Sequence, residues 1–369
     1  MMITHFTSES VASGHPDKIC DQISDAIVDA ALTVDRFSRV AVETMVTKNL
    51  VVMAGEVTCP KKLNYRQIAR QVIKRLGYTK EDYQFSYRSP IDVYIHQQSS
   101  DIAGGVDSGG AGDQGMMYGY ATDETKMLMP LPIMLAHHLV KAMDKARETR
   151  RLPYLRPDGK AEVVVAYENG KPKRVETVVL AVPHDPAISN LELIEDLRKR
   201  VVDRALDFYN LSPKTYKLVV NGTGKWEIGG PASDTGVTGR KIIVDTYGSV
   251  ARHGGGCFSG KDPTKVDRSG AYGCRYLAKN IVAHRLAARC EVRVAYVIGQ
   301  AKPLMVAIET FGTERKKLSV INDFISKLLD MAVPNILEKL NLRRPIYQQT
   351  AVYGHFGNEK YPWERVVAI

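Results

Sequence analysis

A glycine-rich segment of the sequence, GGGCFSGKD at 254 to 262, has residue types that bind phosphate. Residues 255 to 261 fit the pattern GxxxxGK, in which a glycine loop turns backbone N–H groups and a lysine toward phosphate oxygens. The pattern is incomplete, because Asp262 stands where a Walker A loop has a magnesium-binding Ser or Thr, and Pro263 follows it. Taken alone, such a partial match is more often structural or accidental than functional.

Basic residues near this segment favour a phosphate-binding role for it. Arg240, Lys241, Lys261 and Lys265 lie close to it in the sequence. Arginine and lysine side chains both bind phosphate oxygens, so the group could surround a triphosphate. A solvated basic face is the alternative, and the residues alone leave both open.

A second candidate is His15-Pro16-Asp17, directly before a stretch with helical periodicity. The N–H groups and the dipole at a helix start favour negative charge, so this is a candidate anion-binding position. Both His15 and Asp17 are also common capping residues, and that reading stays open.

Other acidic residues carry less chemical information. Asp21, Asp25 and Asp29 share one face of the expected helix, and we expect that face to be solvated because like charges four residues apart mildly destabilise a helix. Glu43 and Glu56 lie in strand-like runs, where carboxylates usually point outward. Asp113 lies in GAGDQG, 110 to 115, whose glycines say only that the backbone moves or approaches something closely.

The elements that must position these residues follow from hydrophobic periodicity and turn residues. The first group comprises a helix over 17 to 34, strands over 39 to 47 and 50 to 58, a helix over 64 to 77, and strands near 91 to 96 and 116 to 122. The second comprises a helix over 132 to 150, a hairpin over 161 to 183 turning at Asn169-Gly170, a helix near 190 to 209, and strands near 216 to 221 and 240 to 246. The third comprises a helix over 267 to 289, a hairpin over 290 to 311 and a helix near 318 to 330.

The helix starts at 17, 132 and 267 imply a repeat of roughly 115 to 135 residues. We therefore expect an α+β fold of three similar units, each a mostly antiparallel sheet with helices on one face. Three glycine-rich segments interrupt the pattern, and long connections of this kind are usually functional or disordered; they are 98 to 115, 222 to 239 and 247 to 266.

Composition narrows the class of protein. The 369 residues carry 51 Lys and Arg against 41 Asp and Glu, a net charge of +10 that suits nucleic acid, an anionic membrane or a highly anionic small substrate. The five cysteines are scattered without CxxC spacing, which favours a reducing compartment over disulfides or zinc. The start has no apolar signal region and no apolar run reaches the ~18 residues of a membrane span, so we expect a cytoplasmic protein.

Read together, five ordered blocks resemble the S-adenosylmethionine synthetases, also called methionine adenosyltransferases. The blocks are FTSESVASGHPDK at 6 to 18, GAGDQGMMYGY at 110 to 120, IGGPASDTGVTGRKIIVDTYG at 228 to 248, GGGCFSGKDPTKVDRS at 254 to 269, and YGHFG at 353 to 357. The resemblance implies that family's pseudo-threefold fold, with units near 1–101, 110–228 and 229–369 whose structural boundaries are interleaved. It also implies attack of methionine sulfur on the 5′ carbon of ATP, followed by hydrolysis of the released triphosphate to pyrophosphate and phosphate.

The same resemblance assigns roles to individual residues. His15 would hydrogen-bond the departing oxygen, and the implied catalytic set is His15, Lys160, Arg240 and Lys241. The implied ATP contacts are His15, Asp158, Lys160, Lys225, Trp226, Asp234, Arg240, Lys241, Cys257 and Lys261. The implied methionine contacts are Glu56, Gln98, Asp113, Asp234 and Lys265. Two Mg²⁺ per site would use Asp17 and Asp267, hard oxygen ligands suited to that ion, and K⁺ would use Glu43.

The family's catalytic pocket forms between two subunits, so the resemblance implies a homodimer or a homotetramer built from two dimers. Two features depart from the family pattern. Ser100 stands where the loop beginning at Gln98 usually has proline, and the stretch after Val106 is shorter than in many members. We expect residues 98 to 110 to form a mobile cover over the pocket, because their glycines permit large backbone changes.

Two rival functions are compatible with parts of the sequence. A nucleotide-dependent kinase or ligase would use the glycines and lysines, but it gives His15 no role at a 5′ oxygen. A nucleic-acid-binding protein would use the positive charge, but it predicts aromatic residues among the basic ones, and 240 to 268 holds only Tyr247 and Phe258. The sequence therefore favours ATP and L-methionine as partners, with neither nucleic acid nor membrane.

Overall fold

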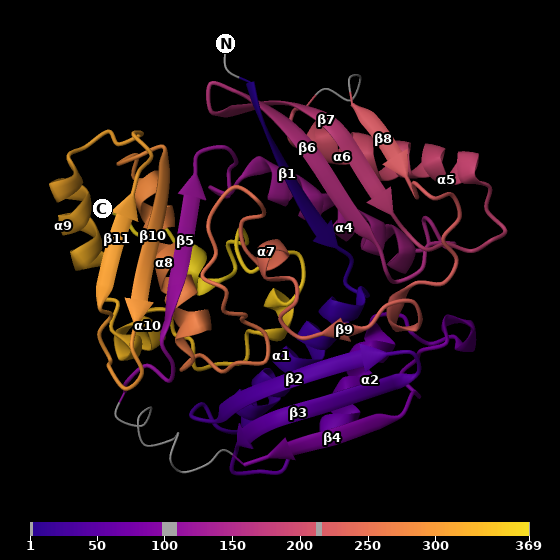
Figure 1. Ribbon diagram of the computed structural model, residues 1–369, viewed down its shortest axis with the longest axis horizontal. Helices are drawn as coiled ribbons and strands as arrows, with labels where there is room; N and C mark the ends of the chain where they lie inside the picture. Colours follow the sequence, from indigo (N-terminus) through magenta and orange to yellow (C-terminus); the bar gives the residue numbers. More distant parts are fainter. Residues whose placement is uncertain (1–2, 98–108, 212–215, 369) are drawn as a thin grey trace.

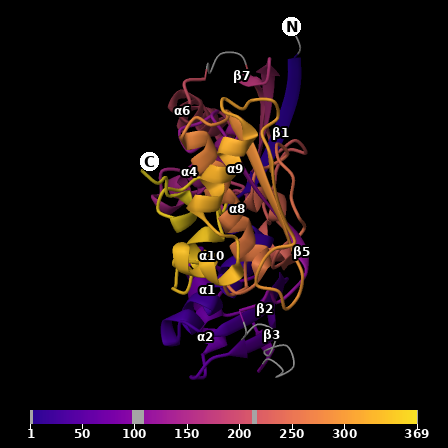
Figure 2. The same ribbon diagram turned by 90° about the vertical axis from the view of Figure 1, so that its left-hand side faces the viewer.

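The computed structural model describes residues 3–97, 109–211 and 216–368. These residues form three β-sheets, which surround a central region that holds the short helix α7 (Ile242–Asp245) (Figure 1). Seen from the side, the sheets lie toward one side of the molecule and the long helices toward the other (Figure 2). The expected α+β fold of three similar units is confirmed.

The first sheet has the order β4-β3-β2-β9. It pairs β2 (Arg39–Thr47) antiparallel with β3 (Leu50–Thr58) and β3 parallel with β4 (Ile91–His96). Helix α1 (Pro16–Val34) packs on β2, and α2 (Tyr65–Arg75) packs on α1. One face of this sheet therefore carries the helices.

The second sheet has the order β1-β6-β7-β8. Its strands are β1 (Ile3–Val11), β6 (Lys160–Glu168), β7 (Lys171–Ala181) and β8 (Lys217–Val220). Helix α4 (Leu131–Glu148) packs on β1 and β6. Helix α5 (Asn190–Leu197) continues through a π-helical turn, Arg198–Val202, into α6 (Asp203–Phe208), which contacts α4.

The third sheet has the order β11-β10-β5 and is antiparallel throughout. Its strands are β5 (Gly115–Thr122), β10 (Arg289–Tyr296) and β11 (Met305–Glu309). Helix α8 (Val266–Ala283) packs against β5 and β10, and α9 (Leu318–Leu328) and α10 (Val333–Lys339) pack on α8. The long helices α1, α4 and α8 thus begin within one residue of the predicted starts.

The units exchange strands in a cycle. Strand β1, which precedes the first sheet's own strands, pairs with β6 in the second sheet. Strand β5, which precedes the second sheet's hairpin, pairs with β10 in the third sheet. Strand β9 (Gly236–Val237), which precedes the third sheet's hairpin, pairs with β2 in the first sheet. Each sheet is therefore completed by an edge strand from another part of the chain.

Several boundaries differ from the sequence predictions. The predicted strand at 240–246 is wrong: Asp245 N–H bonds the Lys241 carbonyl oxygen at 2.8 Å, and the segment forms one helical turn, α7. The β-branched run Ile242-Ile243-Val244 favours a strand, but tertiary contacts of Asp245 override that local preference. The helix predicted to reach residue 289 ends at Ala283, and the sequence reading did not foresee β1 or α10.

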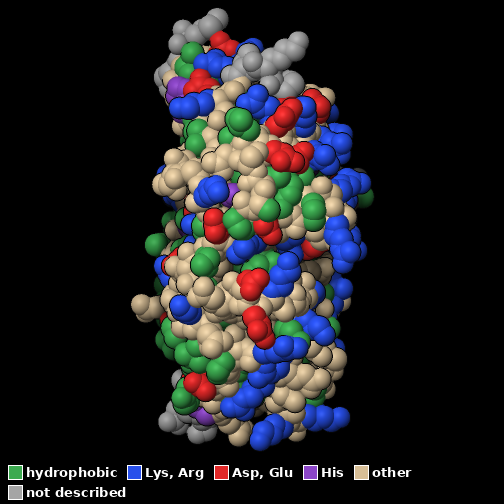
Figure 3. Space-filling model, turned by 90° about the vertical axis from the view of Figure 1, so that its right-hand side faces the viewer, with side chains coloured by type: hydrophobic (Ala, Val, Ile, Leu, Met, Phe, Trp, Pro, Cys, Tyr) green, Lys and Arg blue, Asp and Glu red, His purple; other side chains and the backbone are tan. Residues whose placement is uncertain are grey.

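Two surface observations bear on partners. Among the described helices, none is both long and apolar enough to cross a membrane. Lys and Arg side chains gather along one edge of the face in Figure 3, the edge toward which the helices lie. The positive charge is therefore spread beyond the glycine-rich segment in which the sequence analysis located it.

A buried ion network joins the C-terminal segment to α8. Glu364, 2% exposed, accepts hydrogen bonds from Arg275 at 2.8 and 2.9 Å and from Lys279 at 2.7 Å. It also accepts the N–H of Gly357 at 2.9 Å. Burial by itself would raise the pKa of Glu364, but Arg275 and Lys279 hold it below its usual range. Removing one partner from such a network leaves buried charge uncompensated.

We therefore expect Glu364→Gln to lower the free energy of unfolding by about 3 kcal/mol. Urea denaturation followed by tryptophan fluorescence measures this, since Trp363 is buried beside the substituted residue. The matched control is Glu359→Gln at an exposed position of the same segment, which we expect to change stability by less than about 0.5 kcal/mol. Equal midpoints for the two variants would contradict this role of the network.

Candidate functional site

The first part of the candidate site lies at the start of α1. His15 is the N-cap, with φ −61° and ψ 141°, and its Nδ1 accepts the N–H of Asp17 at 3.2 Å. Asp17 accepts the N–H of Val237 at 2.9 Å and the ammonium of Lys241 at 2.5 Å. The guanidinium of Arg240 lies 3.9 Å from the same carboxylate. The helix start therefore joins His15 and Asp17 to the basic residues that follow β9.

The protonation of His15 follows from its surroundings. Burial, followed by the charge of Lys241, lowers the pKa of His15 to about 3, so the ring is neutral at neutral pH. Because Nδ1 accepts a hydrogen bond, the single proton of a neutral ring lies on Nε2. His15 can thus donate one hydrogen bond from Nε2 to an oxygen without adding positive charge.

The second part of the site is the glycine-rich segment between α7 and α8. Lys261 donates to Asp267 at 2.5 Å, at the start of α8. Burial opposes the charge on Lys261, but Cys257 and Asp267 raise its pKa overall. Burial raises the pKa of the Cys257 thiol, so this cysteine is uncharged at neutral pH. The charges of Glu43 and Asp21 also raise the pKa of this thiol, because the segment lies close to β2 and α1.

The two parts have the same construction, a lysine paired with a carboxylate at 2.5 Å. Burial would raise the pKa of Asp17, but the hydrogen bond from Lys241 lowers it, so Asp17 is ionised. Among the described residues, no group of three His, Cys, Asp or Glu side chains could hold a metal by itself. One carboxylate on each side still fits Mg²⁺, which commonly uses one or two carboxylates and completes its shell with phosphate oxygens and water.

The acidic face of α1 overturns one sequence prediction. Asp21 and Asp25 are fully buried, and Asp29 is mostly buried, so this face is not solvated. Asp21 accepts the N–H of Gly239 at 2.8 Å, and Asp25 accepts the N–H of Gly260 at 2.9 Å. The four-residue spacing of like charges was itself the missed signal, because such a run on a stable helix requires partners.

Asp29 completes this arrangement one turn further along α1. It accepts the N–H groups of Tyr347 and Gln348, both at 2.9 Å. Burial raises its pKa to about 6, although these hydrogen bonds act in the opposite direction. We define the acidic ridge as Asp17, Asp21, Asp25 and Asp29, each of which accepts at least one backbone N–H from a residue between 237 and 348.

A third cluster surrounds Asp158. This buried carboxylate accepts the N–H groups of Gly159 at 2.7 Å and Gly230 at 2.8 Å. Burial raises its pKa to about 6, with Lys160 acting to lower it and Asp234 to raise it. Lys160 also acts on His15, so this cluster adjoins the start of α1. Trp226 is half-buried, and its indole N–H donates to the Ile228 carbonyl oxygen at 2.8 Å.

The other predicted residues lie outside the surroundings of His15, and two of them, Glu43 and Lys265, lie near the second part of the site. Glu43 and Glu56 lie on the face of the first sheet that points away from α1, and Glu56 lies 3.3 Å from His96 of β4. Asp113 is exposed and accepts the N–H of Gln114 at 2.7 Å. Lys225 is exposed, and Lys265 donates to the buried Asp262. Gln98 and residues 98 to 108 of the cover expected over 98 to 110 lie outside the described residues.

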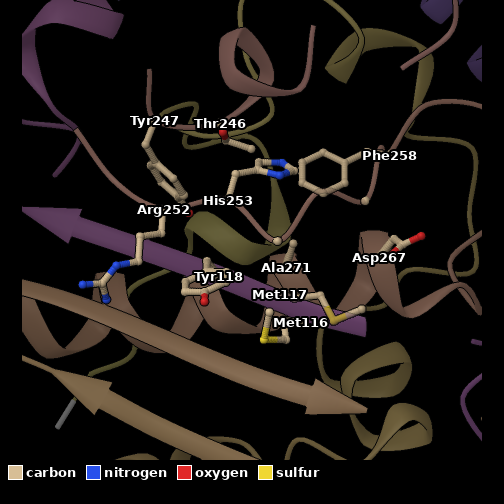
Figure 4. Close-up of a pocket in the computed structure, with 12 residues that line it drawn as sticks. Met116, Met117, Tyr118, Thr246, Tyr247, Arg252, His253, Phe258, Asp267 and Ala271 are labelled. Atoms are coloured by element: carbon tan, nitrogen blue, oxygen red, sulfur yellow. The ribbon is translucent and has the colours of Figure 1, made fainter. Parts of the chain in front are cut away.

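A small pocket opens beside Asp267, at the second part of the site rather than around His15 (Figure 4). It lies between β5 and the glycine-rich segment, where the rings of His253 and Phe258 approach each other. Arg252 turns away from these rings and pairs with Glu291 at 2.8 Å. Asp267 is therefore one of the residues that line this pocket.

Together, these clusters place three cations near one neutral hydrogen-bond donor and a fourth cation in the adjoining glycine-rich segment. Lys241 and Lys160 act on His15, Arg240 lies beside Asp17, and Lys261 lies in the segment that contacts the turn at Gly239. Such an arrangement suits an anion with several negative oxygens, and it includes a donor for an oxygen that gains charge.

Comparisons with known proteins agree with this reading. Models of the N-terminal, central and C-terminal domains of S-adenosylmethionine synthetase match residues 3–100, 108–226 and 228–365. The S-adenosylmethionine synthase of Desulforudis audaxviator (strain MP104C) is 49% identical over 378 residues, covering 98% of this chain and 95% of the relative. That of Sorangium cellulosum (strain So ce56) is 48% identical over 368 residues, covering 98% of this chain and 87% of the relative. Because all three domain models match in order along nearly the whole sequence, the chain belongs to the S-adenosylmethionine synthetase family.

Proposed function

We propose that this protein is an ATP:L-methionine S-adenosyltransferase. The methionine sulfur uses a lone pair to bond the 5′ carbon of ATP, the bond from that carbon to the 5′ oxygen breaks, and the oxygen leaves with the triphosphate. The sulfonium product is S-adenosylmethionine, and water then cleaves the triphosphate to pyrophosphate and phosphate. The observation that carries this proposal is the neutral His15 beside the lysine–carboxylate pair Lys241–Asp17, together with a second such pair, Lys261–Asp267, in the glycine-rich segment.

This arrangement acts where charge develops. The 5′ oxygen gains negative charge as its bond to carbon breaks, and His15 donates a hydrogen bond to it from Nε2. Lys160, Arg240, Lys241 and Lys261 hold the triphosphate. Preorganised donors and cations of this kind lower the barrier, and one such donor is commonly worth about 100-fold or more in rate.

The metal sites are also part of the proposal. Asp17 and Asp267 would each hold one Mg²⁺ together with oxygens of the triphosphate, and Glu43 would hold K⁺. Bound Mg²⁺ stabilises the developing charge of the leaving triphosphate. Each aspartate then exchanges a lysine partner for a metal ion, which leaves Lys241 and Lys261 free to bind phosphate oxygens.

The remaining residues concern the nucleoside and the amino acid. We assign Trp226 to stacking on the adenine, with Asp158, Lys225, Asp234 and Cys257 lining the ATP site. Methionine would contact Glu56, Gln98, Asp113, Asp234 and Lys265. The half-buried Glu56 and the exposed Asp113 both lie outside the clusters around His15, which supports completion of each pocket by a second subunit. We therefore propose a cytoplasmic homodimer or homotetramer with active sites at the dimer interface.

The structure does not favour the rival P-loop kinase. Asp262 occupies the position of the magnesium-binding Ser or Thr, but its oxygens accept the N–H groups of Val40 at 2.8 Å and Thr264 at 2.9 Å. It also pairs with Lys265, and α8 begins only at Val266. Asp262 therefore anchors the segment to β2, and the segment lacks the helix N-terminus that directly follows a P-loop.

Incubation with ATP, L-methionine, Mg²⁺ and K⁺ tests the reaction. We expect mass spectrometry to detect S-adenosylmethionine, and phosphate analysis to detect pyrophosphate and phosphate in equal amounts. Omitting methionine is the control and should remove the sulfonium product. ADP or AMP without a sulfonium product would refute the proposal.

The metal assignment predicts the behaviour of two variants. Asp17→Asn and Asp267→Asn should each reduce kcat by at least about 100-fold and raise the Mg²⁺ concentration needed for half-maximal rate, since each removes an anionic ligand. Rates measured across a magnesium titration provide the test, with Asp82→Asn at an exposed position as the matched control. A variant with normal activity at limiting Mg²⁺ shows that its residue is not a ligand.

Subunit sharing predicts complementation between inactive variants. His15→Ala and Glu56→Ala should each be inactive alone. In mixed dimers, one of the two sites carries both substitutions and the other carries neither, so random mixing should restore about a quarter of the wild-type sites. Differently tagged subunits purified as verified mixed dimers make the measurement direct. No recovery in such dimers would exclude sharing between these residues.

A further inference from the structure

The basic residues proposed to hold triphosphate follow two glycine turns. Arg240 and Lys241 come directly after Gly239, which has φ +78°, and Lys261 comes directly after Gly260, which has φ +82°. A positive φ of this size is readily adopted by glycine and strains most other residues. The backbone conformation of each glycine therefore determines the direction in which the basic side chains after it point.

The N–H of each glycine is held by a buried carboxylate of α1. One oxygen of Asp21 accepts the N–H of Gly239 at 2.8 Å, and its other oxygen accepts the ammonium of Lys18 at 2.9 Å. Lys18 is also bonded to Asp245, so the ammonium is shared between two carboxylates. One oxygen of Asp21 thus pairs with the charge of Lys18, and the other accepts the hydrogen bond from the Gly239 turn.

Asp25 has the same arrangement one helical turn later. One oxygen accepts the N–H of Gly260 at 2.9 Å, and Arg268 bonds both oxygens at 2.7 and 2.8 Å. The same guanidinium donates to the carbonyl oxygen of Lys261 at 2.9 Å. Asp25 and Arg268 therefore fix the backbone on both sides of the Gly260–Lys261 peptide bond.

The two turns also contact each other. A Cβ atom on Gly239 would lie 2.6 Å from the Cβ of Cys257, within the segment that ends at Lys261. One on Gly260 would lie 2.1 Å from the carbonyl oxygen of Val42 in β2. Close approach on both sides leaves little room for either turn to shift, and α1 provides the common reference for both.

We propose that Asp21 and Asp25 are positioning residues, each of which fixes through one glycine N–H the turn that presents the cations for the triphosphate. The inference rests on the proposed function, because it concerns how Arg240, Lys241 and Lys261 reach that ligand. Buried ion pairs seldom add net stability over apolar residues of similar size. A pair of apolar residues could not hold the two glycine N–H groups and so could not align the cations of the site. Misplacement of a binding group by about 1 Å can cost about 100-fold in rate.

Asp21→Asn tests the proposal more cleanly than Asp25→Asn. An asparagine at 21 keeps the shape of the side chain, and Lys18 retains Asp245 as an anionic partner. Asp25→Asn, by contrast, would remove the carboxylate that pairs with the buried Arg268. The amide offers a single acceptor oxygen to Gly239 and Lys18 together. The matched control is Asp29→Asn, on the same helix face, which accepts backbone N–H groups from 347 and 348 instead of from a cation-bearing turn.

The first readout is binding of tripolyphosphate with Mg²⁺, measured by titration calorimetry. We expect Asp21→Asn to weaken binding about tenfold and Asp29→Asn to change it less than about twofold. If the wild-type protein does not bind tripolyphosphate, the proposed function fails. If the wild-type binds and Asp21→Asn binds equally well, the positioning role fails and the proposed function stands.

The second readout is a double-mutant cycle, which separates positioning from a general loss of structure. In a background that carries both Arg240→Ala and Lys241→Ala, Asp21→Asn should weaken tripolyphosphate binding by less than about twofold, because both cations that it positions are gone. In a Lys261→Ala background, the effect should stay close to tenfold. Equal, full effects in both backgrounds would show that Asp21 does not act through its own turn.

A measurement on the wild-type protein covers the case in which Asp21→Asn does not fold. The amide protons of Gly239 and Gly260 should exchange slowly in the absence of ligand, because both are bonded to buried carboxylates. Rapid exchange of these amides in the free protein, followed by protection on adding tripolyphosphate, would mean that the ligand and not α1 orders the turns, and it would overturn the proposal.

Discussion

The structure depends on the burial of four carboxylates spaced one helical turn apart on α1. Charges of one sign at this spacing repel one another, and removing them from water costs several kcal/mol for each ion. The acidic ridge is stable because every carboxylate accepts a backbone N–H, while Lys18 and Arg268 supply opposite charge from within the core. The same hydrogen bonds attach segments between residues 237 and 348 to the N-terminal helix, so the need to satisfy buried charge also determines the tertiary arrangement.

This constraint has a consequence for the state of the site before any ligand binds. Lys241 and Lys261 are each matched by an aspartate at 2.5 Å, so the protein assembles its cations without an anion to hold them together. His15 stays neutral among these cations because burial and Lys241 lower its pKa to about 3. The site thus combines two balanced lysine–carboxylate pairs with one neutral donor, which is an arrangement that needs little reorganisation when charge develops.

The sequence predicted the regular elements well where local signals agree. Asn169 and Gly170, both with positive φ, form the predicted hairpin turn, and Asn64, the first residue of the helix predicted over 64 to 77, is the N-cap of α2. Sequence reasoning failed where tertiary contacts decide: Ile242 to Val244 resembled a strand, and the aspartates of α1 resembled a solvated face. In both cases the partner lies more than 200 residues away, as Gly239 does from Asp21 and Asp245 from Lys18. Periodicity describes neighbours along the chain and carries no information about partners at that separation.

The cyclic exchange of strands constrains the order in which the chain can become complete on the ribosome. The first sheet receives β9 only after residue 237 has been synthesised, so the edge of β2 at Met45 and Val46 has no partner from this chain before then. The N–H groups that satisfy Asp21, Asp25 and Asp29 arrive later still, the last of them at Gln348. The N-terminal unit, although made before the other two, therefore has its buried charges satisfied only after residue 348 has been synthesised.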